Sequence, residues 1–166
     1  MRSLVLAAAA LVSAVPSRTA AQLANRAISV ESGISTPFGG RGAAAAAFAV
    51  SASRWLDGFD AADLDGVLRV ALAAAPETAG RGTAAGVLAT VGLRLSLGRA
   101  PLRPQVFADV GWARPRRGAS DTVAFGLGAA LEWFPAPELS VSPRVALRGA
   151  GGTLAAEGVL AVAAYF

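Results

Sequence analysis

Charged side chains recur at alternate positions in this 166-residue chain, and they are the first candidates for chemistry. Five carboxylates and five arginines share one side of their alternating segments: Glu31, Asp65, Arg69, Arg94, Arg103, Asp109, Glu132, Arg144, Arg148 and Glu157. An isolated charge is costly to bury, whereas a hydrogen-bonded pair is tolerated. The equal numbers therefore predict an internal network of ion pairs, which we call the lumen network.

Residue types suited to catalysis or metal binding are scarce. The chain has no histidine and no cysteine, which removes the commonest general base and the commonest metal ligands. Serines share the charged side, but no neighbouring residue is suited to activate a hydroxyl. Four aspartates gather at one turn, yet no glutamate closes a calcium loop there: Asp57, Asp60, Asp63 and Asp65. We therefore predict no catalytic residue, no cofactor and no metal.

Residues 1–21 have the layout of a secretory signal peptide. Arg2 precedes an apolar stretch from Leu4 to Val15, and small residues lead to Ala21, after which we place the cleavage. The remaining 22–166 form the predicted domain, with 13 arginines against 11 acids. The sequence pI of about 11.2 reflects arginine as the only basic residue type and does not indicate a nucleic-acid partner.

Hydrophobic alternation predicts the secondary structure. Val123, Phe125 and Leu127 alternate with small residues, and seven other segments repeat this period of two. Breaks rich in Gly, Pro and Asp separate the segments. Charge-free runs after the signal peptide reach only 12 residues, which is short for a spanning helix. We predict eight strands of about 9–11 residues each, the length that crosses a bilayer when tilted.

The composition of the two faces indicates which side is outside. A soluble eight-stranded barrel of the lipocalin kind places apolar side chains inside and a charged face in water. Here the polar face is mostly Gly, Ala, Ser and Thr, with one or two charges in a segment. This favours an all-β fold, an eight-stranded antiparallel up-and-down transmembrane β-barrel preceded by a cleaved signal peptide. A soluble exported carrier of an apolar ligand is the alternative.

Residues 126–149, GLGAALEWFPAPELSVSPRVALRG, and the terminal Ala163–Phe166 carry a family resemblance. The chain from about residue 26 resembles the small eight-stranded outer-membrane barrels of the OmpA/OmpX type. The resemblance implies a monomer in the bacterial outer membrane, in contact with membrane lipid. It also implies biogenesis through periplasmic chaperones and a barrel-assembly machinery that reads the C-terminal aromatic signal. Enzymes among small barrels would imply a catalytic histidine, which this chain lacks.

An even number of strands places both termini on the periplasmic side. Five aromatic residues then gather at that end as an interfacial girdle and C-terminal assembly signal: Trp55, Trp133, Phe134, Tyr165 and Phe166. Trp112 falls near the opposite rim, beside a predicted outward loop that contains Arg114, Arg116 and Arg117. Such a basic loop can contact lipopolysaccharide phosphates.

The combined pattern predicts a role in membrane structure or surface interaction, without enzymatic activity. A narrow passive pore is the other membrane hypothesis, because small inner residues could leave water-filled pockets. Eight strands enclose a lumen that side chains can fill, so the two hypotheses differ in whether the lumen network closes the barrel.

Overall fold

The computed structural model describes residues 26–37, 44–59, 62–76, 83–98, 102–114 and 120–166. They form eight β-strands: β1 (Arg26–Pro37), β2 (Ala45–Phe59), β3 (Ala62–Pro76), β4 (Thr83–Leu97), β5 (Leu102–Arg114), β6 (Thr122–Ala136), β7 (Leu139–Ala150) and β8 (Thr153–Tyr165). The predicted signal peptide lies outside the described residues. In the described ranges, no helix is long and apolar enough to cross a membrane.

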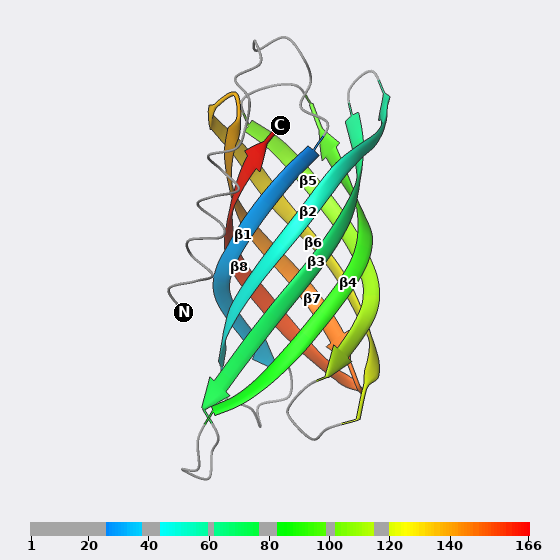
Figure 1. Cartoon of the computed structure of the whole chain (residues 1–166), viewed down its shortest axis with the longest axis vertical. Coiled ribbons are helices and arrows are strands. Elements are labelled where there is room, and N and C mark those ends of the chain that lie inside the picture. The colour runs from blue at the N-terminus through cyan, green and yellow to red at the C-terminus, as the bar shows by residue number, and fades with distance from the viewer. Residues whose placement is uncertain (1–25, 38–43, 60–61, 77–82, 99–101, 115–119) are drawn as a thin grey trace.

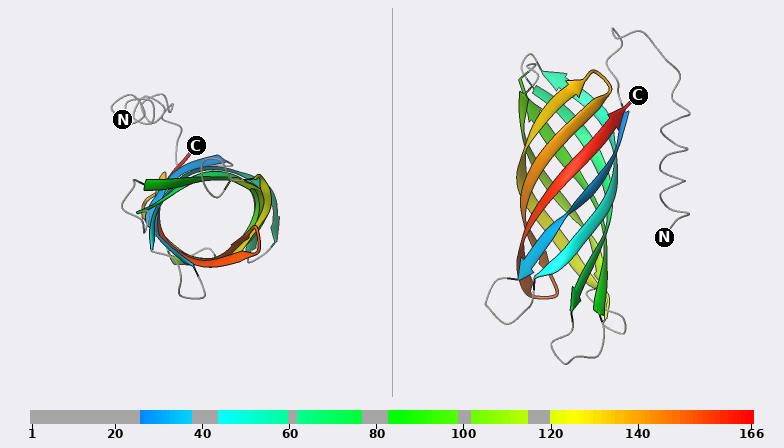
Figure 2. Two further views of the ribbon diagram at one scale, coloured as in Figure 1. Left: turned by 90° about the horizontal axis from the view of Figure 1, so that it is seen from below. Right: turned by 90° about the vertical axis from the view of Figure 1, so that its left-hand side faces the viewer.

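The strands form one closed antiparallel barrel in sequence order (Figure 1). Each strand pairs with its neighbours in the chain, and β1 also pairs with β8, with Val30 opposite Val162. Seen along its axis, the barrel is a complete ring (Figure 2). This confirms the predicted eight-stranded up-and-down barrel.

The first and last strands also close the barrel at their ends. The backbone amide of Arg26 donates to the carbonyl of Phe166, and the amide of Phe166 donates to the carbonyl of Arg26. The start of β1 and the end of β8 therefore lie at the same end of the barrel, together with the ends of β2, β4 and β6 and the starts of β3, β5 and β7 (Figure 1). We call this the terminal end.

The strands are longer than the predicted 9–11 residues, since they contain 12 to 15. Most of the break predicted at Asp57–Asp63 is strand instead, because β2 continues to Phe59 and β3 starts at Ala62. The ladder persists through polar and glycine residues because backbone pairing does not depend on the alternation. A β-bulge between Trp55 and Asp57 accommodates the extension.

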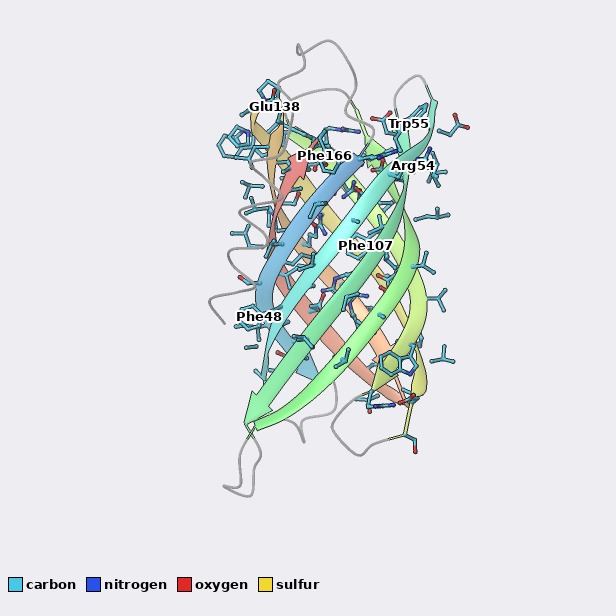
Figure 3. All side chains as sticks on the ribbon, viewed as in Figure 1. Phe48, Arg54, Trp55, Phe107, Glu138 and Phe166 are labelled. Atoms are coloured by element: carbon cyan, nitrogen blue, oxygen red, sulfur yellow. The ribbon has the colours of Figure 1, made fainter. Side chains whose placement is uncertain are left out.

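The barrel is apolar outside and polar inside. Its buried apolar residues are nine alanines and Val159, whereas buried polar residues include Glu31, Arg69 and Glu132. Large apolar side chains are exposed instead, as at Val123 (70% exposed). They project outward around the whole outline of the barrel (Figure 3). The distribution is the reverse of that in a soluble domain.

Small residues inside make room for the few large ones. Phe107 lies directly opposite Gly128 in the β5–β6 ladder, and a Cβ atom on that glycine would lie 2.4 Å from the Phe107 ring. At the other end of the barrel, Gly151 and Gly152 form the β7–β8 turn with positive φ angles of 56° and 78°. Two successive positive φ values suit a two-residue hairpin and favour glycine.

Candidate functional site: the lumen network

A chain of ion pairs crosses the middle of the lumen. Glu31 on β1 accepts hydrogen bonds from Arg69 Nε (2.8 Å) and from Arg144 Nη1 (2.7 Å). Arg69 also donates through Nη2 to Glu157 on β8 (2.7 Å), which accepts a second bond from Arg148 Nε (3.2 Å). Each carboxylate therefore joins two arginines, and the chain ties together strands that are not neighbours in the barrel.

The chain ends at Asp109 on β5. Arg148 Nη1 lies 2.7 and 2.8 Å from its two carboxylate oxygens. These partners belong to β7 and β5, so the pair spans the intervening strand β6 directly over Gly126, which is paired with both residues. A Cβ atom on Gly126 would lie 2.4 Å from Arg148 Nη1 and 2.7 Å from Asp109 Oδ1. The missing side chain is therefore what allows this ion pair.

Two further arginines bind acids of β3. Arg94 donates from Nε (3.0 Å) and Nη2 (2.8 Å) to Asp65 Oδ2, and its Nη2 also reaches Ser53 Oγ (3.0 Å). Arg103 forms an ion pair with Asp63. Asp65 was predicted for the lumen network, whereas Asp63 was predicted only as part of an acidic turn and binds a lumen arginine instead. Asp60 of that turn lies outside the described residues.

Glu132 is held differently, because none of its hydrogen bonds within the described residues comes from an arginine. It accepts from Gln105 Nε2 (2.7 Å), from Ser140 Oγ (2.8 Å) and from the Tyr165 hydroxyl. Gln105 also bonds to Ser96 Oγ (3.1 Å). Glu132 is 1% exposed. This cluster, which we call the Glu132 cluster, packs the lumen toward the terminal end with neutral hydrogen-bond donors.

All ten residues of the predicted lumen network lie on the inner face, but their pairing differs from a simple match of acids with arginines. Arg103 pairs with Asp63, which was outside the predicted set, and Glu132 uses neutral donors. Sequence reasoning missed Gln105 and Ser140 as partners of Glu132. Their only signal was the parity of their positions, because each shares the inner face of its strand.

The aromatic residues at the terminal end divide between two environments. Trp133 and Phe166 are 50% and 44% exposed and continue the apolar outer face, as a girdle requires. Phe134 and Tyr165 differ from the predicted girdle, because their rings pack together at 5.4 Å and the Tyr165 hydroxyl binds Glu132. Alternation reverses the direction of adjacent side chains, so consecutive aromatic residues cannot share one face.

Trp55 also departs from a simple outer girdle. It has the parity of Ser51 and Ser53, which face the lumen, and it precedes the β-bulge at the terminal end. Its side chain is 44% exposed, and its ring lies 3.1 Å from where a Cβ atom of Gly58 would be. Trp55 therefore lies at the mouth of the barrel, at the end where the girdle was predicted, but with the parity of the lumen side.

An exposed polar group lies at the opposite rim. Arg114 Nε donates to Asp121 Oδ1 (2.6 Å), and the guanidinium lies 5.5 Å from the centre of the Trp112 ring. The hydrogen bond from Arg114 lowers the pKa of Asp121 below its ordinary value of 3.8. Of the three arginines predicted for the outward loop, Arg116 and Arg117 lie outside the described residues.

Comparison with known proteins supports the fold. No protein-family model matches the chain, and no curated protein matches its sequence. Solved structures do match, at low identity. Neisserial surface protein A is 12% identical, with a TM-score of 0.65 over 86% of this chain and 97% of that one. The N-terminal β-barrel domain of Pseudomonas aeruginosa OprF is 16% identical, with a TM-score of 0.60 over 87% and 100%.

The outer membrane enzyme PagL is also similar, with 13% identity and a TM-score of 0.58 over 84% of this chain and 99% of that one. At these identities the comparisons establish the fold alone. The chain therefore has the fold of the small eight-stranded outer-membrane β-barrels, as the resemblance in its sequence implied.

Proposed function

We propose that this chain is an integral β-barrel protein of the bacterial outer membrane, with a role in membrane structure or surface interaction. The observation that carries the proposal is the inverted distribution of side chains. Val91, Leu127 and Val145 are 59–65% exposed in mid-strand, whereas Glu31 and Arg69 are buried. Only lipid makes this outer face favourable. A soluble carrier would need the opposite arrangement.

The length of the strands agrees with this location. Strands of 12 to 15 residues, rising about 3.3 Å per residue and tilted by about 40°, span roughly 30–38 Å. The apolar band of an outer-membrane barrel is about 25 Å tall. Each strand can therefore cross the apolar layer and still place its ends in the interfaces.

In this proposal the lumen network acts as internal struts. The ion pairs connect β1, β3, β5, β7 and β8 across the lumen. Removing one partner of a buried pair is strongly destabilising, by about 3–5 kcal/mol, because the other charge stays buried. The network thus favours one closed arrangement of the strands over an open passive pore.

The proposed role is non-enzymatic. Ser29 and Ser51 share a hydrogen bond of 2.6 Å, and Ser51 donates to Glu31 (3.3 Å). Glu31 already forms ion pairs with two arginines, so it is a poor base for activating a serine. Without histidine or cysteine in the chain, these serines have no other activating partner of the usual kinds.

Lipopolysaccharide is the proposed surface partner, and the barrel itself is proposed to be a monomer. Arg114 lies at the rim opposite the terminal end, where its side chain is 49% exposed, and Trp112 beside it is 37% exposed. An exposed arginine beside an interfacial tryptophan suits contact with phosphate groups at the membrane surface. The proposed biogenesis uses periplasmic chaperones and the barrel-assembly machinery, with Phe166 at the C-terminal signal.

Electrophoretic mobility tests the proposal. The purified chain is refolded in detergent micelles and compared on a gel with and without boiling. We expect a heat-dependent shift in mobility, and β-type circular dichroism that forms only with detergent. A chain that folds as a monomer in plain buffer, without a shift, would contradict the membrane location. Single-channel recording on the same material should detect no conductance, whereas open channels would instead support the passive pore.

A further inference from the structure

Arg26 on β1 and Arg54 on β2 form a pair of like charges on the outer face of the barrel. They lie directly opposite each other in the β1–β2 ladder, and both are exposed. Their positions have the parity of Val30 and Val50, which face outward and are 51% and 47% exposed. The two arginine side chains therefore leave the backbone at adjacent positions on the surface that the proposed function places in lipid.

The hydrogen-bond pattern brings these two positions close together. The backbone amide and the backbone carbonyl of Arg26 both bond to Phe166 on β8. In an antiparallel ladder, such a residue forms a non-hydrogen-bonded pair with its neighbour on the other side, where the Cα atoms are about 4.5 Å apart. Like charges directly opposite each other destabilise a sheet, so this pair calls for an anion between its side chains.

The other arginines of the described strands already have carboxylate partners. Arg26 and Arg54 form no ion pair with any residue that the structure describes, and the acids of the strands β1 and β8, Glu31 and Glu157, are buried in the lumen. The arginines that do form ion pairs are Arg69, Arg94, Arg103, Arg114, Arg144 and Arg148.

The arginine pair lies at the level of the aromatic girdle, and the nearest exposed acids lie beyond it. Figure 3 shows Arg54 and Phe166 at about one height, with Glu138 farther toward the terminal end. Asp57 follows Arg54 on β2 past the β-bulge, and its carboxylate accepts a hydrogen bond from the next backbone amide (2.8 Å). Aromatic girdles mark the depth of the lipid headgroups, so Arg26 and Arg54 are at the depth of lipid phosphates.

Apolar side chains flank the pair on both sides. Phe166, beside Arg26, is 44% exposed. Leu56 is 52% exposed and lies against Gly66, the neighbour of Arg54 on β3. A lipid held by its phosphate at this pair would therefore find apolar surface for its acyl chains next to it.

We propose that Arg26 and Arg54 together bind the phosphate of one anionic glycerophospholipid in the leaflet at the terminal end. Arginine presents a planar fork of donors that matches phosphate oxygens, and basic residues near a membrane surface attract anionic headgroups. Two adjacent guanidinium groups suit a single phosphate group, at the end of the barrel opposite the rim proposed to contact lipopolysaccharide. This inference rests on the proposed location in the outer membrane.

Native mass spectrometry tests the site. The refolded chain in detergent micelles is titrated with phosphatidylglycerol, or with phosphatidylcholine of the same acyl chains, and the lipids retained by the protein are counted. We expect one phosphatidylglycerol to be retained at concentrations at which phosphatidylcholine is not, because the choline cation of the second lipid offsets the charge of its phosphate.

Variants on the outer face identify the residues without altering the lumen. Arg54→Gln should weaken the binding of phosphatidylglycerol about fivefold, which is the contribution of one basic residue near a membrane surface. Arg54→Glu should abolish the binding, and it should fold readily because opposite charges then face each other across the ladder. Arg103→Gln is the control, since it removes an arginine at the same end of the barrel but from the lumen, and it should still retain the lipid.

The heat-dependent mobility shift of each protein separates this site from the membrane location. A chain that shows the shift but retains both lipids equally would overturn the site and leave the membrane location standing. A chain without the shift would overturn both. Binding that survives Arg54→Glu, or that Arg103→Gln weakens as much as Arg54→Gln does, would place the lipid elsewhere or assign its binding to net charge, and would overturn the proposal as well.

Discussion

Gly126 shows how a single inner residue controls an ion pair. The Arg148–Asp109 pair lies over this glycine, in space that a side chain would occupy. Gly126→Ala should push the charged partners apart and lower the free energy of unfolding by about 1–3 kcal/mol, since buried charged groups would lose good hydrogen bonds. Urea unfolding in micelles measures the change.

Gly158 is the control for Gly126, because it is also in mid-strand but faces outward. A Cβ atom there would meet no atom within 4 Å. Gly158→Ala should therefore leave stability within about 0.5 kcal/mol or raise it slightly, as the unfolded chain loses freedom. Equal losses in the two variants would show that backbone propensity matters here, and not space for the ion pair.

Strand β7 contains two inward-facing serines that can be compared as a matched pair. Ser140 and Ser142 both face the lumen and are both 1% exposed. Ser140 donates to Glu132 (2.8 Å), whereas the Ser142 hydroxyl has no hydrogen-bond partner within the described ranges. Ser140→Ala should lower the free energy of unfolding by about 1–3 kcal/mol, because the Glu132 carboxylate loses a donor.

Ser142→Ala should be close to neutral or stabilising, since it removes a buried hydroxyl that gains nothing from folding. Urea midpoints of the two variants, measured side by side, decide the point. If both serines prove equally important, Ser142 has a partner that the described residues do not provide, and the account of β7 fails.

The location of the whole molecule predicts how stability depends on depth in the membrane. Val91 lies in the middle of β4 and Leu102 begins β5, and both side chains face outward. In lipid, Val91→Arg should make folding into vesicles less favourable by about 2–4 kcal/mol, and Leu102→Arg by about 0–1 kcal/mol. Folding titrations in phospholipid vesicles measure both values. Equal tolerance at the two positions would contradict a bilayer around the barrel.

Local alternation already determined much of this molecule. A period of two assigns each residue to a face by its parity, so the eight strands, the antiparallel order and the inner position of residues such as Glu31 and Arg148 were predictable. The same rule would have separated Phe134 from Trp133, because adjacent residues face opposite sides. The lengths of the strands were less predictable, since backbone pairing continues through residues that do not alternate.

The choice of partners was decided only by the tertiary structure. Glu31 and Arg144 are 113 positions apart, yet they meet at 2.7 Å. Asp109 meets Arg148 because two registers place both beside Gly126. Parity is a property of one strand, but a contact across the lumen depends on the stagger and tilt of all eight strands after closure. The sequence by itself therefore determined which residues face inward, and the closed barrel decided which of them pair.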